Sequence, residues 1–190
     1  CAANGNMIHQ EHDLAFPAIA GALNLVRTYN SLIADRVGVF GAGWSSVLDM
    51  RVDLTESGAV SVTLGDGAAV PFVSSDRSWV STSRREVELT RGDDGHWTLQ
   101  PDPVRAFEFD AEGALTGWRV GVARVEVARD GAGRIVALHE RVTGRSIGVE
   151  WERALVAALA AGDGGRVRYE RDEHERVVRG ESDSGRGNYE

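Results

Sequence analysis

The side chains best suited to metal binding or nucleophilic chemistry lie near the start of the chain. His9 and Glu11 are two residues apart, so on a β-strand they share a face, and one more ligand would complete a metal site. His12 would point to the opposite face. Cys1 is the only cysteine, which excludes an internal disulfide and every multi-cysteine metal site. It could be a nucleophile, a lipid acceptor or a proteolytic or cloning boundary. We favour the boundary, and we predict no metal.

Residues that could do acid–base or hydrolytic chemistry follow between positions 41 and 54. Asp49 and Asp53 lie on the polar side of an alternating segment, so we expect a solvated strand face and not a catalytic pair. Ser45 and Ser46 lack the Gly-x-Ser-x-Gly turn of serine hydrolases. The glycines at 41 and 43 are not followed by Gly-Lys-Ser/Thr, so they do not form a phosphate loop. We therefore predict that the chain is not an enzyme and has no catalytic or cofactor-binding residue.

The block Arg-Thr-Tyr-Asn-Ser at residues 27–31 is better explained as structure. Alternation places Arg27 and Tyr29 on the same side of a strand as Leu23 and Leu25, and Asn30 lies where the strand enters a turn. A buried guanidinium is costly without a partner. We predict a structural ion pair between Arg27 and a carboxylate, with contact to a ligand or partner as the alternative.

A second structural group surrounds the first tryptophan. Gly41 and Gly43 permit a turn that other side chains would block, and they place a hinge directly before Trp44. We expect Trp44 to anchor the N-terminal part against the first strands. A functional pocket at this tryptophan is the alternative.

The elements that must position these residues are predicted to be strands. Residues 44–54 alternate with a period of two, which indicates one half-buried strand. Residues 59–73 predict a hairpin around Gly65-Asp66-Gly67, with Pro71 at a sheet edge or strand end. Further apolar pairs follow at intervals of 8 to 12 residues, with turns at 93–95 and 111–113. This rhythm is typical of an all-β protein.

A repeat of about 20 residues continues this rhythm to the end of the sequence. Its units cover residues 105–121, 124–144, 145–165 and 166–185, and another unit starts at Arg186. Tyr169 and Asp172 mark the clearest unit. Residues 150–160 have helical propensity, but the repeat register favours strand, turn and strand, and we predict a hairpin there. Such hairpins gain stability by stacking into one continuous sheet.

The predicted architecture is therefore all-β in two parts. Residues 1–104 form an N-terminal β domain, and residues 105–190 form an antiparallel β-hairpin array that is truncated inside a repeat. The net charge of −8 argues against a nucleic-acid surface. No apolar run reaches 18 residues, so we expect no membrane span.

Both parts resemble the Rhs (rearrangement hotspot) family of YD-repeat proteins. The stretch Arg-Val-Arg-Tyr-Glu-Arg-Asp at 166–172 is similar to the start of a YD repeat, and residues 130–135 are similar to its turn and second strand. Residues 4–7, 25–31 and 40–45 resemble, in order and spacing, the domain that precedes the Rhs shell. The repeat is degenerate, because the third and fourth units lack the turn glycine.

The resemblance implies a structural function. Rhs proteins wind such hairpins into a hollow shell, or cocoon, that encloses a C-terminal toxin or other effector until delivery, and the N-terminal domain caps or begins that shell. It implies as partners the rest of the shell, its effector, and a secretion apparatus or an immunity protein, with a secreted or cell-surface location. The alternative is a glycan- or receptor-binding β module. That alternative would use exposed rings among the tryptophans at 79, 97, 118 and 151, which we expect instead to pack between strands.

Overall fold

The computed structural model describes residues 6–15, 23–55, 58–75, 78–83, 87–174, 176–182 and 185–188. Three sequence features lie outside these residues: Cys1, the resemblance at residues 4 and 5, and residues 189 and 190 of the unit that starts at Arg186. The described parts consist of strands, turns and two short 3-10 helices, and none of them is an α-helix. The all-β prediction is confirmed. Among the described residues no helix is long and apolar enough to span a membrane.

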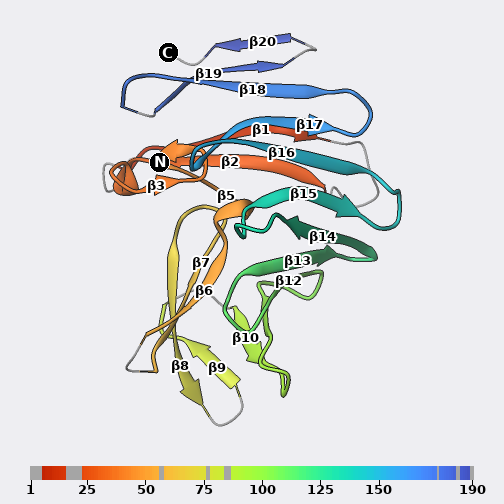
Figure 1. The fold of residues 1–190 in the computed structure, drawn as a ribbon. Helices are drawn as coiled ribbons and strands as arrows, with labels where there is room; N and C mark the ends of the chain where they lie inside the picture. Colours follow the sequence, from red (N-terminus) through yellow and green to blue (C-terminus); the bar gives the residue numbers. More distant parts are fainter. Residues whose placement is uncertain are drawn as a thin grey trace.

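Two small sheets form the N-terminal part. The first has the order β1–β2–β5 and is antiparallel. The second pairs β3 with β4. Figure 1 shows these strands in red and orange. They lie beside three strands of the large sheet, β16 (Ser146–Glu152), β17 (Leu155–Ala161) and β18 (Arg166–Arg171). The elements are β1 (Ile8–Ala15), β2 (Asn24–Asn30), η2 (Ser31–Ile33), β3 (Val37–Gly38), β4 (Gly41–Ala42), β5 (Trp44–Ser46) and η3 (Val47–Asp49).

One 15-stranded antiparallel sheet contains all the remaining strands, in strict sequence order. Its first strands are β6 (Arg51–Leu54), β7 (Val60–Thr63), β8 (Ala69–Ser75), β9 (Ser78–Ser81), β10 (Glu88–Arg91) and β11 (Trp97–Gln100). The sheet begins at Arg51, and β11 pairs with the next strand, β12 (Arg105–Phe109). Its hydrogen bonding therefore continues across the predicted boundary between residues 104 and 105. The domain boundary placed there stays a prediction.

The four predicted repeat units are four hairpins. They are β12 (Arg105–Phe109) with β13 (Leu115–Val120), β14 (Ala123–Arg129) with β15 (Ile135–Glu140), β16 (Ser146–Glu152) with β17 (Leu155–Ala161), and β18 (Arg166–Arg171) with β19 (Val177–Ser182). A last strand, β20 (Gly185–Asn188), pairs with β19. Residues 150–160 form a hairpin, as the repeat register predicted. Tertiary pairing outweighs local helix propensity there.

The prediction of one strand over residues 44–54 is wrong. The chain leaves β5 at Ser46, makes the 3-10 turn η3, and enters a different sheet as β6. The reason is a capping box: the Ser46 side chain accepts a hydrogen bond from a backbone N–H of the turn, and the Asp49 carboxylate accepts from the Ser46 backbone. Ser45 and Ser46 are both buried.

Pro71 also lies elsewhere than predicted. It is inside β8, which has β7 on one side and β9 on the other. The Pro71 carbonyl accepts a hydrogen bond from Thr82, one residue beyond the end of β9. The missing N–H therefore faces the place where the ladder with β9 ends, and a proline is tolerated there.

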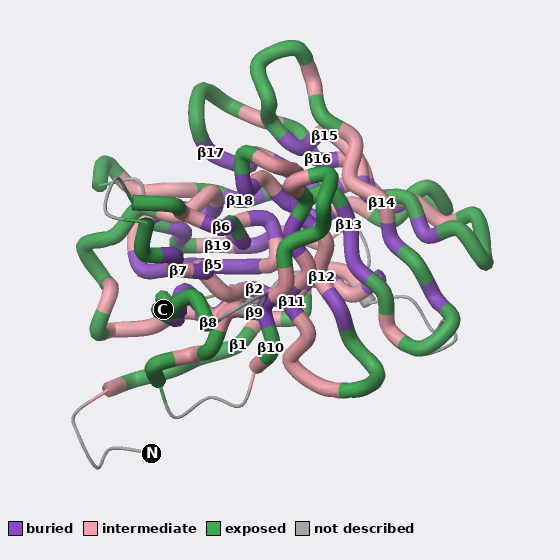
Figure 2. Tube along the Cα trace, turned by 90° about the horizontal axis from the view of Figure 1, so that it is seen from below, coloured by how far each residue is buried: buried purple, intermediate pink, exposed green. Residues whose placement is uncertain are grey.

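The large sheet curls so that its first strand meets its own seventh turn. Arg51 of β6 forms a bridge with Ala114, and the Val52 N–H donates to the Gly113 carbonyl at 2.9 Å. Buried residues of the β1–β2–β5 sheet, Phe40 of the β3–β4 turn and buried residues of the large sheet form one hydrophobic cluster, from Leu23 to Val177. Figure 2 shows this buried inner zone and the exposed hairpin turns around it. The N-terminal part and the array therefore share a core.

Candidate functional site

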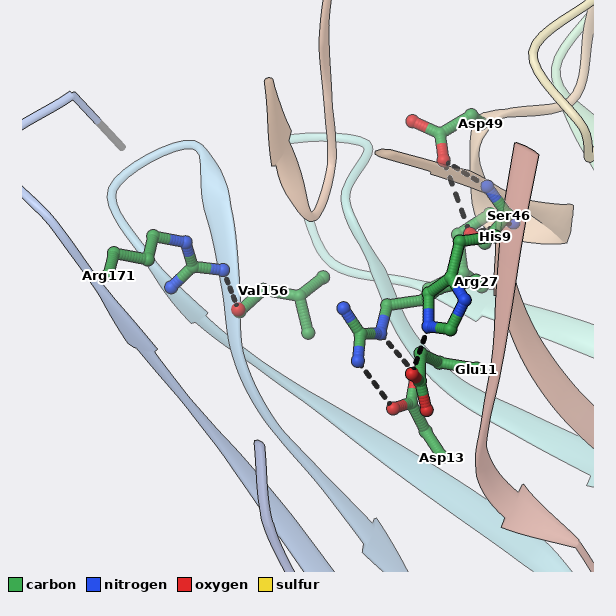
Figure 3. Close-up of polar contacts among 9 residues, drawn as sticks. His9, Glu11, Asp13, Arg27, Ser46, Asp49, Val156 and Arg171 are labelled. Carbon is green, nitrogen blue, oxygen red and sulfur yellow. Dashed lines mark hydrogen bonds and ion pairs between the residues drawn. The ribbon is translucent and has the colours of Figure 1, made fainter. Parts of the chain in front are cut away.

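A buried ion pair lies where the N-terminal sheet contacts the array. The Arg27 guanidinium on β2 holds the Asp13 carboxylate of β1 with two hydrogen bonds, Nε to Oδ2 at 2.5 Å and Nη2 to Oδ1 at 2.8 Å (Figure 3). The Arg27 side chain is fully buried and that of Asp13 is 2% exposed. The predicted structural pair of Arg27 with a carboxylate is confirmed, because the fork of the guanidinium matches both carboxylate oxygens.

Three aromatic rings enclose this pair. The Arg27 guanidinium carbon lies 4.4 Å from the Trp44 ring centre, 4.7 Å from that of Tyr169 and 5.5 Å from that of Phe40. Phe40 and Tyr169 meet edge to face at 5.2 Å. A cation over desolvated rings adds attraction of about 2 kcal/mol or more. We call Asp13, Arg27, Phe40, Trp44 and Tyr169 the arginine box.

The sheet register explains why Asp13 reaches Arg27. Glu11 lies directly opposite Arg27, and the register shifts between His12 and Leu14. Asp13 is thus the extra residue of a β-bulge, a feature that bends a strand and re-aims a side chain. The bulge leaves the directly opposed Glu11 partly exposed, and the diagonal carboxylate enters the core.

Burial raises the pKa of the Asp13 carboxyl above its ordinary value. The hydrogen bonds and charge of Arg27 act in the opposite direction, as does the hydroxyl of Tyr169, and the nearby Glu11 raises the pKa further. The guanidinium is therefore the main group that opposes the effect of burial on the pKa of this carboxyl. Removing either partner of such a buried pair would leave an uncompensated buried charge, which is strongly destabilising.

His9 and Glu11 do share a face, and their side chains contact each other. Both line a cavity of about 870 Å³ between β1 and the fourth hairpin. Within the described residues no three His, Cys, Asp or Glu side chains are grouped so that they could hold a metal ion.

The other predicted residues of the N-terminal part shape the loops around the arginine box. The Asn30 side chain accepts from the Leu32 N–H and so caps η2. Gly43 has a φ of +76°, and a Cβ there would lie 2.6 Å from the Tyr29 ring. Tyr29 packs against Trp44 with ring centres 5.6 Å apart. Gly41, with a φ of +109°, turns the β3–β4 hairpin. These residues hold Trp44 in place over Arg27.

Asp49 was expected on a solvated strand face, and this prediction is wrong. Its carboxylate accepts hydrogen bonds from the Val39 N–H at 2.7 Å and the Ser46 N–H at 2.8 Å. Burial raises its pKa, and these hydrogen bonds oppose the increase. Asp49 thereby ties the β3–β4 hairpin to η3. The spacing Ser-x-x-Asp at residues 46–49 was a signal of this capping box.

Asp172 lies away from the arginine box, in the turn of the fourth hairpin. Its carboxylate accepts from the backbone N–H groups of His174 and Arg176, and from the Arg176 side chain. The Arg176 hydrogen bond lowers the pKa of Asp172, with further help from these backbone groups. Asp130 holds the second hairpin turn in the same way with Arg134. The Asp of the repeat therefore fixes the turn geometry.

The tryptophans are mostly inside. Trp97 is fully buried and Trp118 is 5% exposed. Trp79 packs on Trp97 with ring centres 5.4 Å apart, and the Trp151 indole donates to the Ile135 carbonyl. This agrees with packing between strands. An open ring platform of the kind that binds sugars is not what these contacts form.

Sequence reasoning named Arg27, Trp44 and Tyr169 but not that they meet. It also missed Asp13 and Phe40. Alternation places His9, Glu11 and Asp13 on the same face of β1. Only the bulge determines that Asp13, and not Glu11, pairs with Arg27. Phe40 sits in a loop without a periodic pattern.

The comparisons with known proteins concern the N-terminal part. No curated protein matches the chain. Residues 2–72 match the family described as "Domain of unknown function (DUF6531)", a range that includes four of the five residues of the arginine box. The chain thus carries a DUF6531 match at its N-terminus, followed by a long antiparallel β-sheet.

Proposed function

We propose that this chain caps and begins the β-shell of an Rhs-type YD-repeat protein that encloses a C-terminal toxin or other effector for delivery. The observation that carries the proposal is the arginine box. Tyr169 belongs to the fourth hairpin, yet it closes over an ion pair of the N-terminal sheet. An N-terminal segment that shares a core with a growing hairpin sheet has the form required of a cap.

The hairpin array supports the same function. Its strands follow one another in sequence order, so each added hairpin lengthens the sheet without a crossover. Such a sheet gains area in one direction and can curve around a cargo. The partners are then the remainder of the shell and its effector, and the protein works outside the cell or at its surface.

The test uses the longest natural polypeptide that contains this chain. Limited proteolysis should leave a region after the array intact in the wild-type protein. Arg27→Met should expose that region to cleavage, because it leaves the Asp13 carboxylate buried and unpaired. Arg141→Met is the matched control, since its pair with Glu126 is exposed and contributes little.

A downstream region that is cleaved equally fast in the intact protein and as a separate fragment would refute the shell function. Saturable quenching of tryptophan fluorescence by a glycan would instead support the alternative of a binding module.

A further inference from the structure

The second, third and fourth hairpins of the array share a position whose side chain donates a hydrogen bond to the backbone of the preceding hairpin. It is the first residue after the register shift of the hairpin. We call it the staple position. Its occupants in the four hairpins are Phe109, Arg129, Trp151 and Arg171.

The staple side chains of the second and third hairpins make the same hydrogen bond. Arg129 Nη2 donates to the Leu115 carbonyl at 2.9 Å, and Trp151 Nε1 donates to the Ile135 carbonyl at 2.7 Å. Leu115 and Ile135 both begin the second strand of the preceding hairpin. Leu115 is itself paired with a staple residue, Phe109, as Ile135 is with Arg129.

The fourth hairpin continues the row. Arg171 Nη2 donates to the Val156 carbonyl, and Val156 is paired with Trp151, the preceding staple residue. An indole and a guanidinium share an N–H donor but not a charge. The hydrogen bond to the carbonyl is therefore what the position has in common.

A second contact joins the same hairpins on the outer face. In each case the side chain five residues before the staple of one hairpin forms an ion pair. Its partner is the side chain one residue before the staple of the preceding hairpin. Arg124 contacts Glu108 at 2.8 Å, and Arg166 contacts Glu150. Between the second and third hairpins these two positions hold Ala128 and Ser146, so both partners are replaced together.

We propose that these two contacts select the hairpin that can dock at the β19 edge, with the β20 segment as its first strand: a hairpin of the same kind, with an N–H side chain at its staple position. The next carbonyl in the row belongs to Val177, and the next carboxylate to Glu170. Arg186 faces Glu181 in the ladder as Arg166 faces Ala160, so it occupies the position five before the next staple. The inference rests on the proposed function, in which the array continues.

The test extends the chain with a copy of its own fourth hairpin. Residues 1–185 are followed by a second copy of residues 166–185, with Arg, Trp or Phe at the staple position of the copy. Phe keeps a ring but has no N–H. Hydrogen–deuterium exchange at the amides of β19 should slow at least fivefold more with Arg or Trp than with Phe, as expected for one hydrogen bond of about 1 kcal/mol.

Equal protection by the Phe copy would overturn the role of the staple, and no protection by any copy would overturn docking at this edge. The outer contact is tested in the natural chain by Ala128→Glu, Ser146→Arg and the double variant. The double variant should have a folding equilibrium constant about 1.4- to 5-fold above the product of the single effects. If the equilibrium constant of the double variant does not exceed the product of the single effects, the proposed contact is overturned. None of these measurements needs an effector, so they stand or fall separately from the shell function.

Discussion

The first strand of the large sheet contacts the β12–β13 turn. This contact predicts that alanine substitution destabilises the protein much more at one turn glycine than at another. Gly113 and Gly133 occupy the same place in successive hairpin turns, with φ values of +87° and +80°, and each donates its N–H to the turn aspartate. A Cβ added at Gly133 would meet open space. A Cβ added at Gly113 would lie 1.9 Å from the Val52 carbonyl oxygen.

The magnitudes follow from these surroundings. Alanine at a positive φ costs about 1–2 kcal/mol, so Gly133→Ala should destabilise by about 1 kcal/mol after the smaller unfolded-state entropy is counted. Gly113→Ala carries the same cost and must also push β6 away. That movement breaks the hydrogen bond from Val52, worth about 1 kcal/mol, and exposes part of a valine whose full burial contributes about 1.5–3 kcal/mol. We expect a total of about 3–4 kcal/mol for Gly113→Ala.

Urea denaturation followed by tryptophan fluorescence measures both variants against the wild type. The free energy of unfolding of Gly113→Ala should be about 2–3 kcal/mol lower than that of Gly133→Ala. This corresponds to a Tm about 4–12 °C lower for a chain of this size. Equal losses in the two variants would refute the closure of β6 on the turn. A larger loss for Gly133→Ala would refute the assignment of open space around that turn.

Three further predictions concern buried charges and one strained turn. Arg27→Met should lower the free energy of unfolding by about 3–5 kcal/mol at neutral pH, because the buried Asp13 carboxyl loses the guanidinium that offsets the cost of its burial. Its pKa, already raised in the folded state, rises further without the guanidinium, so the folded state then binds the extra proton. The deficit should therefore shrink as pH falls towards the unfolded pKa of about 3.9, and urea titrations showing a pH-independent deficit would contradict this. Asp49→Asn should cost about 1–3 kcal/mol, since one amide oxygen cannot serve both the Val39 and Ser46 N–H groups. Hydrogen exchange should accelerate at Val39 or at Ser46, whichever N–H loses its acceptor, and unchanged exchange at both would count against this. Arg153 has a φ of +57°, so Arg153→Gly should stabilise by up to about 1 kcal/mol. A lower Tm would show that the turn is not strained.

The sequence allowed a good prediction of the array, because strand alternation and turn residues are local signals. The hairpin at residues 150–160 was predictable only from the repeat, since its composition favours a helix. The error at residues 44–54 has the opposite origin. Alternation continued across Asp49, but the capping box with Ser46 ended the strand and moved the chain to another sheet. Burial of Arg27 was predictable from alternation, whereas the choice of Asp13 depends on a bulge that no local pattern indicates.

The arginine box also predicts the order in which the two parts fold. Asp13, Arg27, Phe40 and Trp44 come from the first strands, but the ring that completes the box is that of Tyr169, far later in the chain. Until the fourth hairpin pairs, the ion pair is open to water on that side and gains less from its partners. The N-terminal sheet should therefore reach full stability only when the array has formed to β18. A contact of such long sequence separation is expected to form late. In the proposed function, the cap would therefore be completed only when the fourth hairpin has paired.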